Sequence, residues 1–167
     1  DVVAVMSRLK AAPGRMEIVS YSPYTLVDYA HTPDALEKAL KTLHALKKGD
    51  LWVIFGCGGD RDKSKRPVMG RVASLNSDKI IVTSDNPRSE NPQVIINEIM
   101  RGICSDKTVI QLENRQEAIG YALKNANCDD IILIAGKGHE AYQQIGSVKY
   151  AFSDQDIIRG LCNEHCS

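Results

Sequence analysis

Charged residues and glycines gather in four short segments of the sequence, and each segment directly follows an apolar one. These segments are residues 28–31, 56–66, 84–88 and 136–140. Their carboxylates, guanidinium groups and amides could form ion pairs and charge-assisted hydrogen bonds with carboxylate, phosphate or ammonium groups. Charges of both signs suit a zwitterionic or polyanionic small ligand better than a lipid.

The segment Ser84-Asp85-Asn86-Pro87-Arg88 offers the most specific chemistry. A turn at this point could hold the Arg88 guanidinium so that it binds a carboxylate through two parallel hydrogen bonds. The amide of Asn86 would add directional hydrogen bonds. The same residues could instead form a simple turn that leaves the arginine in solvent, and their spacing does not decide between the two.

The glycine-rich segment GCGGDRD covers residues 56–62. Its glycines at positions 56, 58 and 59 would allow the backbone to approach a ligand closely, with Arg61 binding a carboxylate or phosphate. A tight turn without a ligand is the alternative. Because position 61 is arginine, the segment does not match the dinucleotide fingerprint G-x-G-x-x-G.

The segment GKGHE at residues 136–140 places two glycines beside a carboxylate. Glu140 could accept a hydrogen bond from an ammonium group, or the charges could simply face water at a strand end. His139 and His31 could act as metal ligands or bases, although a histidine held by structural hydrogen bonds is the more frequent case. Asp28 could accept from sugar hydroxyls or cap the turn that follows it.

Several common catalytic and metal-binding patterns are absent from the sequence. It contains neither the phosphate-binding signature G-x-x-x-x-G-K-[ST] nor the nucleophile motif G-x-S-x-G, so we expect no catalytic residue in this chain. The five cysteines are scattered, and only Cys162 and Cys166 lie four residues apart. We therefore expect no metal site, and free thiols of the kind found in the cytoplasm.

The composition is typical of a soluble single domain. The chain has 167 residues, with 21 acidic and 21 basic residues that give a formal net charge of zero. A neutral chain offers no electrostatic basis for binding nucleic acid or an anionic membrane. No apolar run approaches the ~20 residues of a spanning helix, and we expect a cytoplasmic protein. Nothing in the sequence argues for a dimer, so we expect a monomer. The chain does not begin with Met, which suggests a fragment.

Hydrophobic periodicity and turn signals predict strands that alternate with helices. Strands are expected over residues 15–20, 25–29, 51–55, 79–83, 108–112 and 130–135, with a hairpin over residues 143–152 that turns at 146–147. Helices are expected over residues 2–9 and 114–125, from Thr32 to about Gly49, and from Pro67, Asn91 and Ser153 onward. The apolar positions expected to face inward include Val68, Leu75 and Val94.

This alternation with short connections indicates the α/β class. We predict a Rossmann-like, doubly wound, mostly parallel sheet with an antiparallel edge hairpin and helices on both faces. In such a sheet the segments that follow the parallel strands meet at the carboxyl edge, where ligands bind. The four charged segments should therefore lie close together.

Five runs of the sequence closely resemble the C-terminal domain of the Mur ligases. They are PGRME (13–17), VDYAHTPDALEKAL (27–40), LWVIFGCGGDRDKSKRPVMG (51–70), TSDNPRSENP (83–92) and AGKGHE (135–140). They follow the order of the family and span most of the chain. The run DNPR resembles the family's recognition motif for meso-diaminopimelate, and the lysine-adding members differ at this motif.

The resemblance implies roles for individual residues. It assigns the binding of meso-diaminopimelate to Arg61, Asp85, Asn86, Pro87, Arg88, Gly136 and Glu140. It assigns contacts with ATP to Arg15, Asp28 and His31. Meso-diaminopimelate carries two carboxylates and two ammonium groups, so the arginines suit its carboxylates and Glu140 suits its distal ammonium group.

The resemblance also implies that the chain is one part of an ATP-dependent amide ligase of peptidoglycan synthesis. Such a ligase adds meso-diaminopimelate to UDP-MurNAc-L-Ala-D-Glu, and its central domain binds most of the ATP and the Mg²⁺. Residues 1–12 would be the linker from that domain, and residues 13–167 the amino-acid-binding domain. The isolated chain should then be inactive. A lysine-adding or folylpolyglutamate-type ligase domain and a stand-alone binding module are the alternatives.

Overall fold

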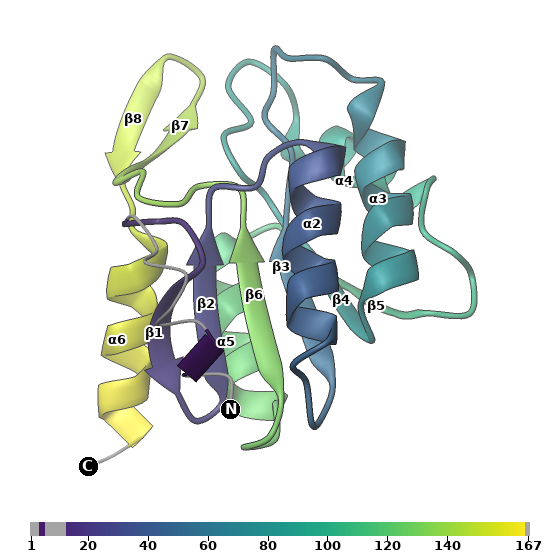
Figure 1. Cartoon of the computed structure of the whole chain (residues 1–167). Helices are drawn as coiled ribbons and strands as arrows, with labels where there is room; N and C mark the ends of the chain where they lie inside the picture. Colours follow the sequence, from purple (N-terminus) through teal and green to yellow (C-terminus); the bar gives the residue numbers. More distant parts are fainter. Residues whose placement is uncertain (1–3, 6–12, 166–167) are drawn as a thin grey trace.

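A six-stranded sheet forms the centre of the structure, a computed structural model that describes residues 4–5 and 13–165 (Figure 1). Helices cover both faces of this sheet. The predicted helix over residues 2–9 and the linker over residues 1–12 lie largely outside the described residues.

The strand order in the sheet is β1-β2-β6-β3-β4-β5. At one edge, β1 (Glu17–Tyr21) runs antiparallel to β2 (Tyr24–Asp28). All other neighbours pair in parallel, and the remaining strands are β6 (Ile131–Ala135), β3 (Leu51–Phe55), β4 (Lys79–Val82) and β5 (Thr108–Gln111). The predicted mostly parallel, doubly wound sheet with an antiparallel edge hairpin is confirmed.

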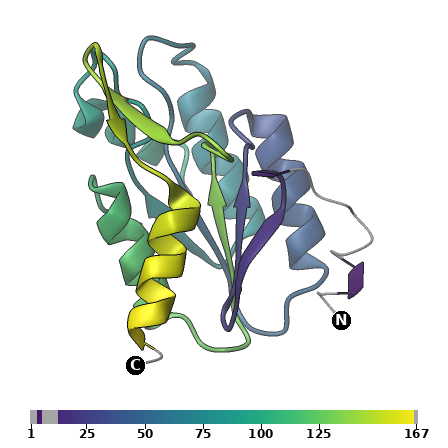
Figure 2. The same cartoon turned by 90° about the vertical axis from the view of Figure 1, so that its left-hand side faces the viewer.

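The helices form two layers (Figure 2). One face is covered by α2 (Pro33–His44), α3 (Lys65–Asn76) and α4 (Pro92–Met100), and the other by α5 (Arg115–Asn125) and α6 (Asp154–His165). A second hairpin, β7 (Tyr142–Ile145) and β8 (Val148–Ala151), forms a separate two-stranded sheet. No helix in the described part of the chain is long and apolar enough to cross a membrane.

The central strands are apolar along their whole length because helices cover both of their faces. Every residue of β3 and of β6 is buried. Alternate residues point to opposite faces, so Leu133 packs with the layer of α2, α3 and α4, whereas Ile132 packs with α5 and α6. These two apolar layers fix the strands from whose ends the charged segments leave.

Three helices begin as the capping residues predict. The side chains of Thr32, Asn91 and Asn114 each accept a hydrogen bond from a backbone N–H group of the first turn. Such bonds satisfy donors that have no partner within the helix, and so they set where each helix begins.

Two helix boundaries differ from the predictions. α2 ends at His44, before Gly49, whose N–H instead donates to the carbonyl oxygen of Asp129 at 3.0 Å. α3 begins at Lys65 rather than at Pro67. Proline is compatible with the whole first turn because the N–H groups there lack helical partners, so it locates a helix start only to within one turn.

Three apolar positions predicted to face inward are exposed. Val68, Leu75 and Val94 have 46%, 65% and 48% of their surface accessible. The apolar residues of α3 and α4 cover a wider arc of the helix circumference than the arc that packs against the sheet. Those at the margin of the arc therefore face solvent, and the sequence does not show which margin that is.

The strand order places the charged segments side by side. β2, β6, β3 and β4 are consecutive parallel neighbours, so their carboxyl ends meet at one edge, at the top of Figure 1. The chain continues from β2 and β3 into α2 and α3 on one face of the sheet. After β6 it continues through the second hairpin into α6 on the other face. Such a divergence opens a crevice at the strand ends.

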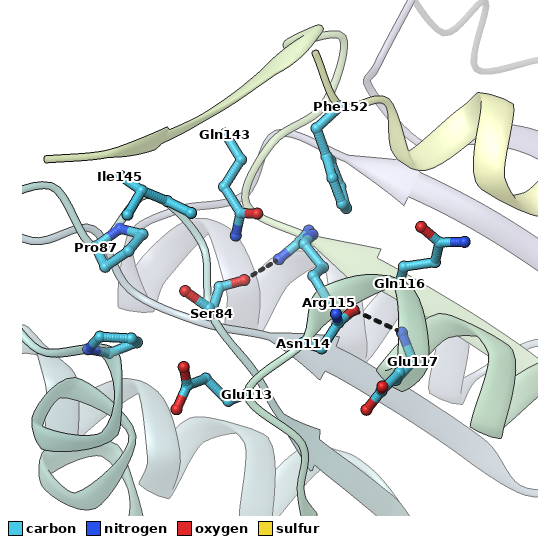
Figure 3. A pocket seen from close by; sticks show the side chains of 11 residues that line it. Ser84, Pro87, Glu113, Asn114, Arg115, Gln116, Glu117, Gln143, Ile145 and Phe152 are labelled. Carbon is cyan, nitrogen blue, oxygen red and sulfur yellow. Dashed lines mark hydrogen bonds between the residues drawn. The ribbon is translucent and has the colours of Figure 1, made fainter. Parts of the chain in front are cut away.

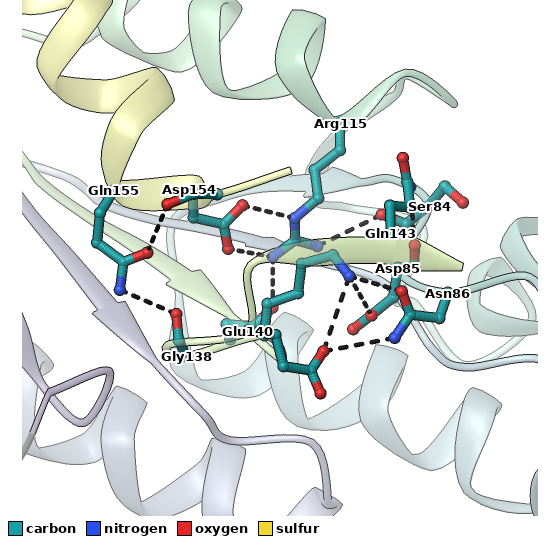
Figure 4. A network of polar contacts seen from close by, with 12 residues as sticks. Ser84, Asp85, Asn86, Arg115, Gly138, Glu140, Gln143, Asp154 and Gln155 are labelled. Atoms are coloured by element: carbon teal, nitrogen blue, oxygen red, sulfur yellow. Dashed lines mark hydrogen bonds and ion pairs between the residues drawn. The ribbon is translucent and has the colours of Figure 1, made fainter. Parts of the chain in front are cut away.

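A buried ion pair ties the helices of one layer to this edge (Figure 4). Arg115 donates from Nε and Nη2 to the two carboxylate oxygens of Asp154 at 2.9 and 2.8 Å, and both side chains are fully buried. The same guanidinium donates to the carbonyl oxygens of Ser84 at 3.4 Å and Ala135 at 3.2 Å. The pair therefore holds the beginning of two charged segments.

Replacing Arg115 with leucine should lower the free energy of unfolding by about 3–5 kcal/mol, because Asp154 then becomes a buried charge without its partner. Asp154→Leu should have a similar effect, and the double variant should lose less than the sum of the two. Urea denaturation followed by circular dichroism measures these changes. The exposed Arg159→Leu serves as control and should cost less than about 1 kcal/mol. Strictly additive losses would contradict the coupling.

Candidate functional site

A cavity of about 470 Å³ opens at the carboxyl edge, where the four charged segments meet. It is lined by Tyr29, His31, Thr32, Gly58, Arg61, Asp62, Lys65, Asp85, Asn86, Arg88, Gly136, Glu140 and Tyr142. The predicted convergence of the four segments is therefore confirmed. Most of the residues predicted to bind an amino acid line this one cavity.

Two arginines flank Gly58 in the cavity wall. A Cβ built on Gly58 would lie 2.8 Å from Nη1 of Arg88 and 3.7 Å from Cγ of Arg61, so a larger residue would displace a guanidinium. Nη1 of Arg88 donates to the carbonyl oxygen of Gly59 at 2.9 Å, and Nη1 of Arg61 donates to that of Asp60 at 3.0 Å. Each of these bonds uses one of the five N–H groups that a guanidinium carries. The remaining N–H groups of each arginine can still bind an anionic ligand in the fork geometry.

The other two glycines of residues 56–59 approach the neighbouring segment of the protein. A Cβ on Gly56 would lie 2.2 Å from the carbonyl oxygen of Thr83, and one on Gly59 would lie 1.8 Å from that of Pro87. The N–H of Gly59 also donates to the carbonyl oxygen of Asn86 at 2.8 Å. A close backbone approach is thus present, but its partner at these two positions is backbone rather than a ligand.

Arg88 occupies a left-handed backbone conformation with a φ of 52°. Its N–H donates to the carbonyl oxygen of Gln144 at 3.1 Å, and its own carbonyl oxygen accepts from the N–H of Gly146 at 2.7 Å. An uncommon conformation of this kind persists only where the surroundings enforce it. Here β7 and its turn do so, and the half-buried Arg88 side chain lines the cavity.

A buried arginine supports the glycine-rich segment from below. Arg66 donates to both carboxylate oxygens of Glu90, to Glu98, and to the carbonyl oxygen of Gly58 at 3.0 Å. Glu90 also accepts from the N–H of Asp60 at 2.7 Å. The hydrogen bonds from Arg66 and Asp60 lower the pKa of Glu90 from 4.5 to about 2. This ionised carboxylate therefore anchors the loop that carries Arg61.

Asp85, Asn86 and Glu140, which are labelled in Figure 4, surround a buried lysine beneath another part of the wall. Nζ of Lys137 lies 3.3 Å from Oδ1 of Asp85 and 3.8 Å from Oε1 of Glu140. It donates to Oδ1 of Asn86 at 2.7 Å, and Nδ2 of Asn86 donates to Oε1 of Glu140 at 3.4 Å. Burial lowers the pKa of Lys137, and the nearby carboxylate of Asp85 opposes this shift. Asn86 and Glu140 thus present a donor and an anion at the cavity.

Sequence reasoning assigned no role to the buried cations Arg66, Arg115 and Lys137. Each lies at the beginning of a helix or directly after a buried strand, where a charge faces the carboxyl edge. Their partners Glu90, Asp154 and Asn86 lie 24, 39 and 51 residues away in the chain. Spacing along the sequence therefore carried little signal for these pairs.

The residues predicted to contact ATP lie near one another, and of the three only His31 lines the cavity. Asp28 accepts a hydrogen bond from the N–H of Met16 at 2.8 Å, as a residue that caps local turns would. The Arg15 guanidinium lies 5.6 Å from the centre of the Tyr29 ring, and the Tyr29 and His31 rings are 4.6 Å apart. Tyr29 therefore joins Arg15 and His31 in one cationic and aromatic surface.

Pro87 lies apart from the rest of its motif and lines a second cavity (Figure 3). This cavity, of about 520 Å³, is bounded by the start of α5 and by the second hairpin. Ile145 and Phe152 contribute apolar surface to it, and the buried Arg115 is already paired with Asp154. The position of Pro87 suits a role in shaping the turn rather than in touching a ligand of the first cavity.

Within the described part of the chain, no cluster of histidine, cysteine, aspartate and glutamate could hold a metal ion. Cys57 is buried, and burial raises the pKa of its thiol to about 12. Cys104, Cys128 and Cys162 are also free thiols, and Cys166 lies outside the described residues. The described cysteines therefore form no disulfide.

Comparison with known proteins relates the chain to one family. Residues 14–138 match the family described as Mur ligase, glutamate ligase domain. A curated relative from Haemophilus ducreyi, UDP-N-acetylmuramoyl-L-alanyl-D-glutamate--2,6-diaminopimelate ligase, is 50% identical over 161 residues. The match covers 93% of this chain and 32% of the relative. The chain thus spans about a third of the length of that relative.

Two solved structures show the same fold. A structure of UDP-N-acetylmuramoyl-L-alanyl-D-glutamate--2,6-diaminopimelate ligase superposes with a TM-score of 0.89 at 42% identity, over 96% of this chain and 33% of that one. The bifunctional folylpolyglutamate synthase/dihydrofolate synthase from Yersinia pestis, complexed with AMPPNP and Mn ion, gives a TM-score of 0.60 at 18% identity, over 93% and 32%. At that identity the second similarity concerns the fold alone.

Glu90 should stabilise the fold at neutral pH and lose this contribution in acid. Its pKa is lowered from 4.5 to about 2 in the folded chain, so its contribution is complete above pH 4.5 and disappears as the pH falls through 2. Urea denaturation of the wild type and Glu90→Gln measures the effect. Their difference in unfolding free energy should be large at pH 6 and small at pH 2, while the exposed Glu113→Gln shows little difference at either. A difference that does not vary with pH would exclude this role.

Proposed function

This chain belongs to the Mur ligase family, within its glutamate ligase domain, and from this premise we propose a specific activity. The chain is the C-terminal domain of a ligase that adds meso-diaminopimelate to UDP-MurNAc-L-Ala-D-Glu in peptidoglycan synthesis. Residues 13–167 form the amino-acid-binding domain, and residues 1–12 link it to a central ATP-binding domain. The name of the Haemophilus ducreyi relative, a 2,6-diaminopimelate ligase, supports this choice of amino acid.

The distribution of charge around the cavity carries the proposal. Arg61 and Arg88 flank one stretch of the wall, and Glu140 lies in another beside the amide of Asn86. Meso-diaminopimelate has a carboxylate and an ammonium group at each of its ends. The guanidinium groups match its carboxylates, and Glu140 with the Gly136 carbonyl matches the distal ammonium group.

In the reaction, this domain would hold meso-diaminopimelate so that its amine is oriented for attack on the activated glutamyl carboxylate. In the complete enzyme, ATP would phosphorylate the glutamyl carboxylate and leave as ADP. The amine of meso-diaminopimelate would then attack this acyl phosphate and displace phosphate to form the amide. A fixed orientation of the amine replaces a bimolecular encounter and can supply several kcal/mol of the rate enhancement. The cavity need supply no nucleophile for this role, because the amine of the bound amino acid is itself the nucleophile.

ATP and Mg²⁺ would bind mainly to the central domain. The resemblance to the Mur ligases assigns Mg²⁺ to that domain. Arg15, Asp28 and His31 would reach the nucleotide when the two domains close around it. The aromatic and cationic surface around Tyr29 supports this assignment, since it suits a base or a phosphate.

The chain should bind meso-diaminopimelate more tightly than L-lysine. L-lysine lacks the second carboxylate, so one arginine of the cavity gains no partner. Arg88→Ala removes a charge-assisted hydrogen bond, which is worth about 1.5–3 kcal/mol. The variant should therefore bind meso-diaminopimelate about 10- to 100-fold more weakly and lose the preference over L-lysine. Isothermal titration calorimetry of the chain with the two amino acids measures both quantities.

The exposed Arg71 of α3 provides a matched control, because Arg71→Ala removes the same charge outside the cavity. Arg88→Ala keeps a Cβ at the left-handed position, so the backbone strain there is unchanged. Arg88→Lys retains the charge without the fork and should recover only part of the affinity. Tighter binding of L-lysine by the wild type would indicate a lysine-adding ligase. Binding of a folylpolyglutamate precursor instead would indicate the folyl-type relatives.

The chain by itself should not catalyse the ligation. Its sequence contains no phosphate-binding G-x-x-x-x-G-K-[ST] signature, so we expect ATP activation to need the central domain. An assay that contains the chain, ATP, Mg²⁺, UDP-MurNAc-L-Ala-D-Glu and meso-diaminopimelate should release no more ADP than a blank without protein. Turnover above this blank would show that the division of labour proposed here is wrong.

A further inference from the structure

Lys137 is a fully buried cation whose ammonium group contacts four residues that line the cavity. Its side chain has no accessible surface, and Nζ donates to Oδ1 of Asn86 at 2.7 Å and to the carbonyl oxygen of Tyr142 at 3.0 Å. Asp85 and Glu140 provide carboxylates at 3.3 and 3.8 Å. A buried ammonium group needs such compensation because its transfer from water is costly. The site is therefore built around this one charge.

The contacts of Asn86 fix which end of its amide faces the cavity. Oδ1 accepts from Nζ of Lys137 and also from the backbone N–H of Gln144 at 2.9 Å. Both partners are donors only, so neither can bind the NH₂ end of the amide. Nδ2 must therefore point the other way, toward Glu140 at 3.4 Å. A ligand at this point meets a hydrogen-bond donor, which suits a carboxylate.

The backbone around Lys137 allows its side chain to reach this position. Gly136 and Gly138 on either side have φ values of 116° and 56°, which side-chain-bearing residues rarely adopt. A Cβ on Gly136 would lie 2.6 Å from Oδ2 of Asp85. A larger residue at position 136 would thus displace the carboxylate that accompanies Lys137.

We propose that Lys137 is a positioning residue of the amino-acid site, which fixes the amide of Asn86 as a donor and keeps Asp85 and Glu140 in place. This inference rests on the proposed function, because it assigns to Lys137 a part in selecting the amino acid. Lys137 itself lies beneath the cavity wall and does not line the cavity. It acts through Asn86, and its loss should change the selectivity of the site as well as its stability.

Lys137→Met should lower the affinity for meso-diaminopimelate at least tenfold and reduce its preference over L-lysine. Without Nζ, the Asn86 amide has one donor partner fewer and can rotate, so the site no longer favours a carboxylate. Calorimetry with both amino acids measures the ratio of the two affinities, which a purely structural role would leave unchanged. Lys107→Met is the control, because this lysine also donates to a carbonyl oxygen but precedes β5, at the opposite edge of the sheet. It should change neither affinity by more than about twofold.

A double-variant cycle separates action through Asn86 from an independent effect. If Lys137 acts through this amide, Lys137→Met should weaken binding far less in an Asn86→Ala background than in the wild type. Equal fold-losses in the two backgrounds would overturn the proposal. So would wild-type affinity and selectivity in a folded Lys137→Met chain.

A second variant tests the amide orientation without removing Lys137, in case Lys137→Met does not fold. Asn86→Asp retains an oxygen for Lys137 and Gln144 and replaces only the donor Nδ2. It should remain folded by circular dichroism, lose at least tenfold in affinity for meso-diaminopimelate, and lose less for L-lysine. An equal loss for both ligands would contradict the assigned orientation.

A ligand-free measurement distinguishes failure of this inference from failure of the proposed function. In a ¹H–¹⁵N spectrum of the wild-type chain, the pair of signals from the Asn86 side-chain NH₂ should lie away from the positions typical of exposed asparagines, as expected for a hydrogen-bonded amide in a fixed environment. These signals should shift strongly or broaden in Lys137→Met but not in Lys107→Met. Unchanged Asn86 signals would refute the positioning role. If the spectra behave as expected but the wild type does not bind meso-diaminopimelate, the proposed function fails and the positioning of Asn86 stands.

Discussion

Three cations buried beneath the carboxyl edge of the sheet constrain the rest of the structure. Arg66, Arg115 and Lys137 have no accessible side-chain surface, and each contacts carboxylates and at least one backbone carbonyl oxygen. Buried charges tolerate little displacement of their partners, because a partner lost in a low-dielectric interior is not replaced by water. The loops above them therefore take their shape from this layer of charge, and a ligand meets groups that are already oriented.

The fold could be predicted from the sequence to the extent that local patterns decide it. Fully apolar runs gave β3 and β6, because strands buried on both faces have no polar alternation. Capping residues such as Thr32 located the helix starts. The exposure of Val68 and Leu75 could not be predicted, since the part of a helix surface that meets the sheet depends on contacts between distant elements.

Some features of the site, like those of the fold, follow from local sequence, and others depend on residues that are distant in the chain. The convergence of Arg61, Arg88 and Glu140 follows from parallel strands with charged residues at their ends, which the sequence shows. The direction in which the Asn86 amide points depends on Lys137, 51 residues away, and on a backbone N–H of β7. No periodicity connects such residues. Sequence reasoning thus identified groups that line the cavity and missed the buried groups that contact them.

The glycine-rich loop of residues 56–59 lies against the loop of residues 83–87, and this contact limits how the site can evolve. Gly56 and Gly59 lie directly against the backbone at Thr83 and Pro87, with no room for a side chain between them. A mutation that reshapes one loop must be matched in the other, so single substitutions cannot explore the geometry of the cavity freely. The lining of the cavity can change more readily through side-chain replacement at fixed backbone positions such as Arg88 than through loop insertions or deletions.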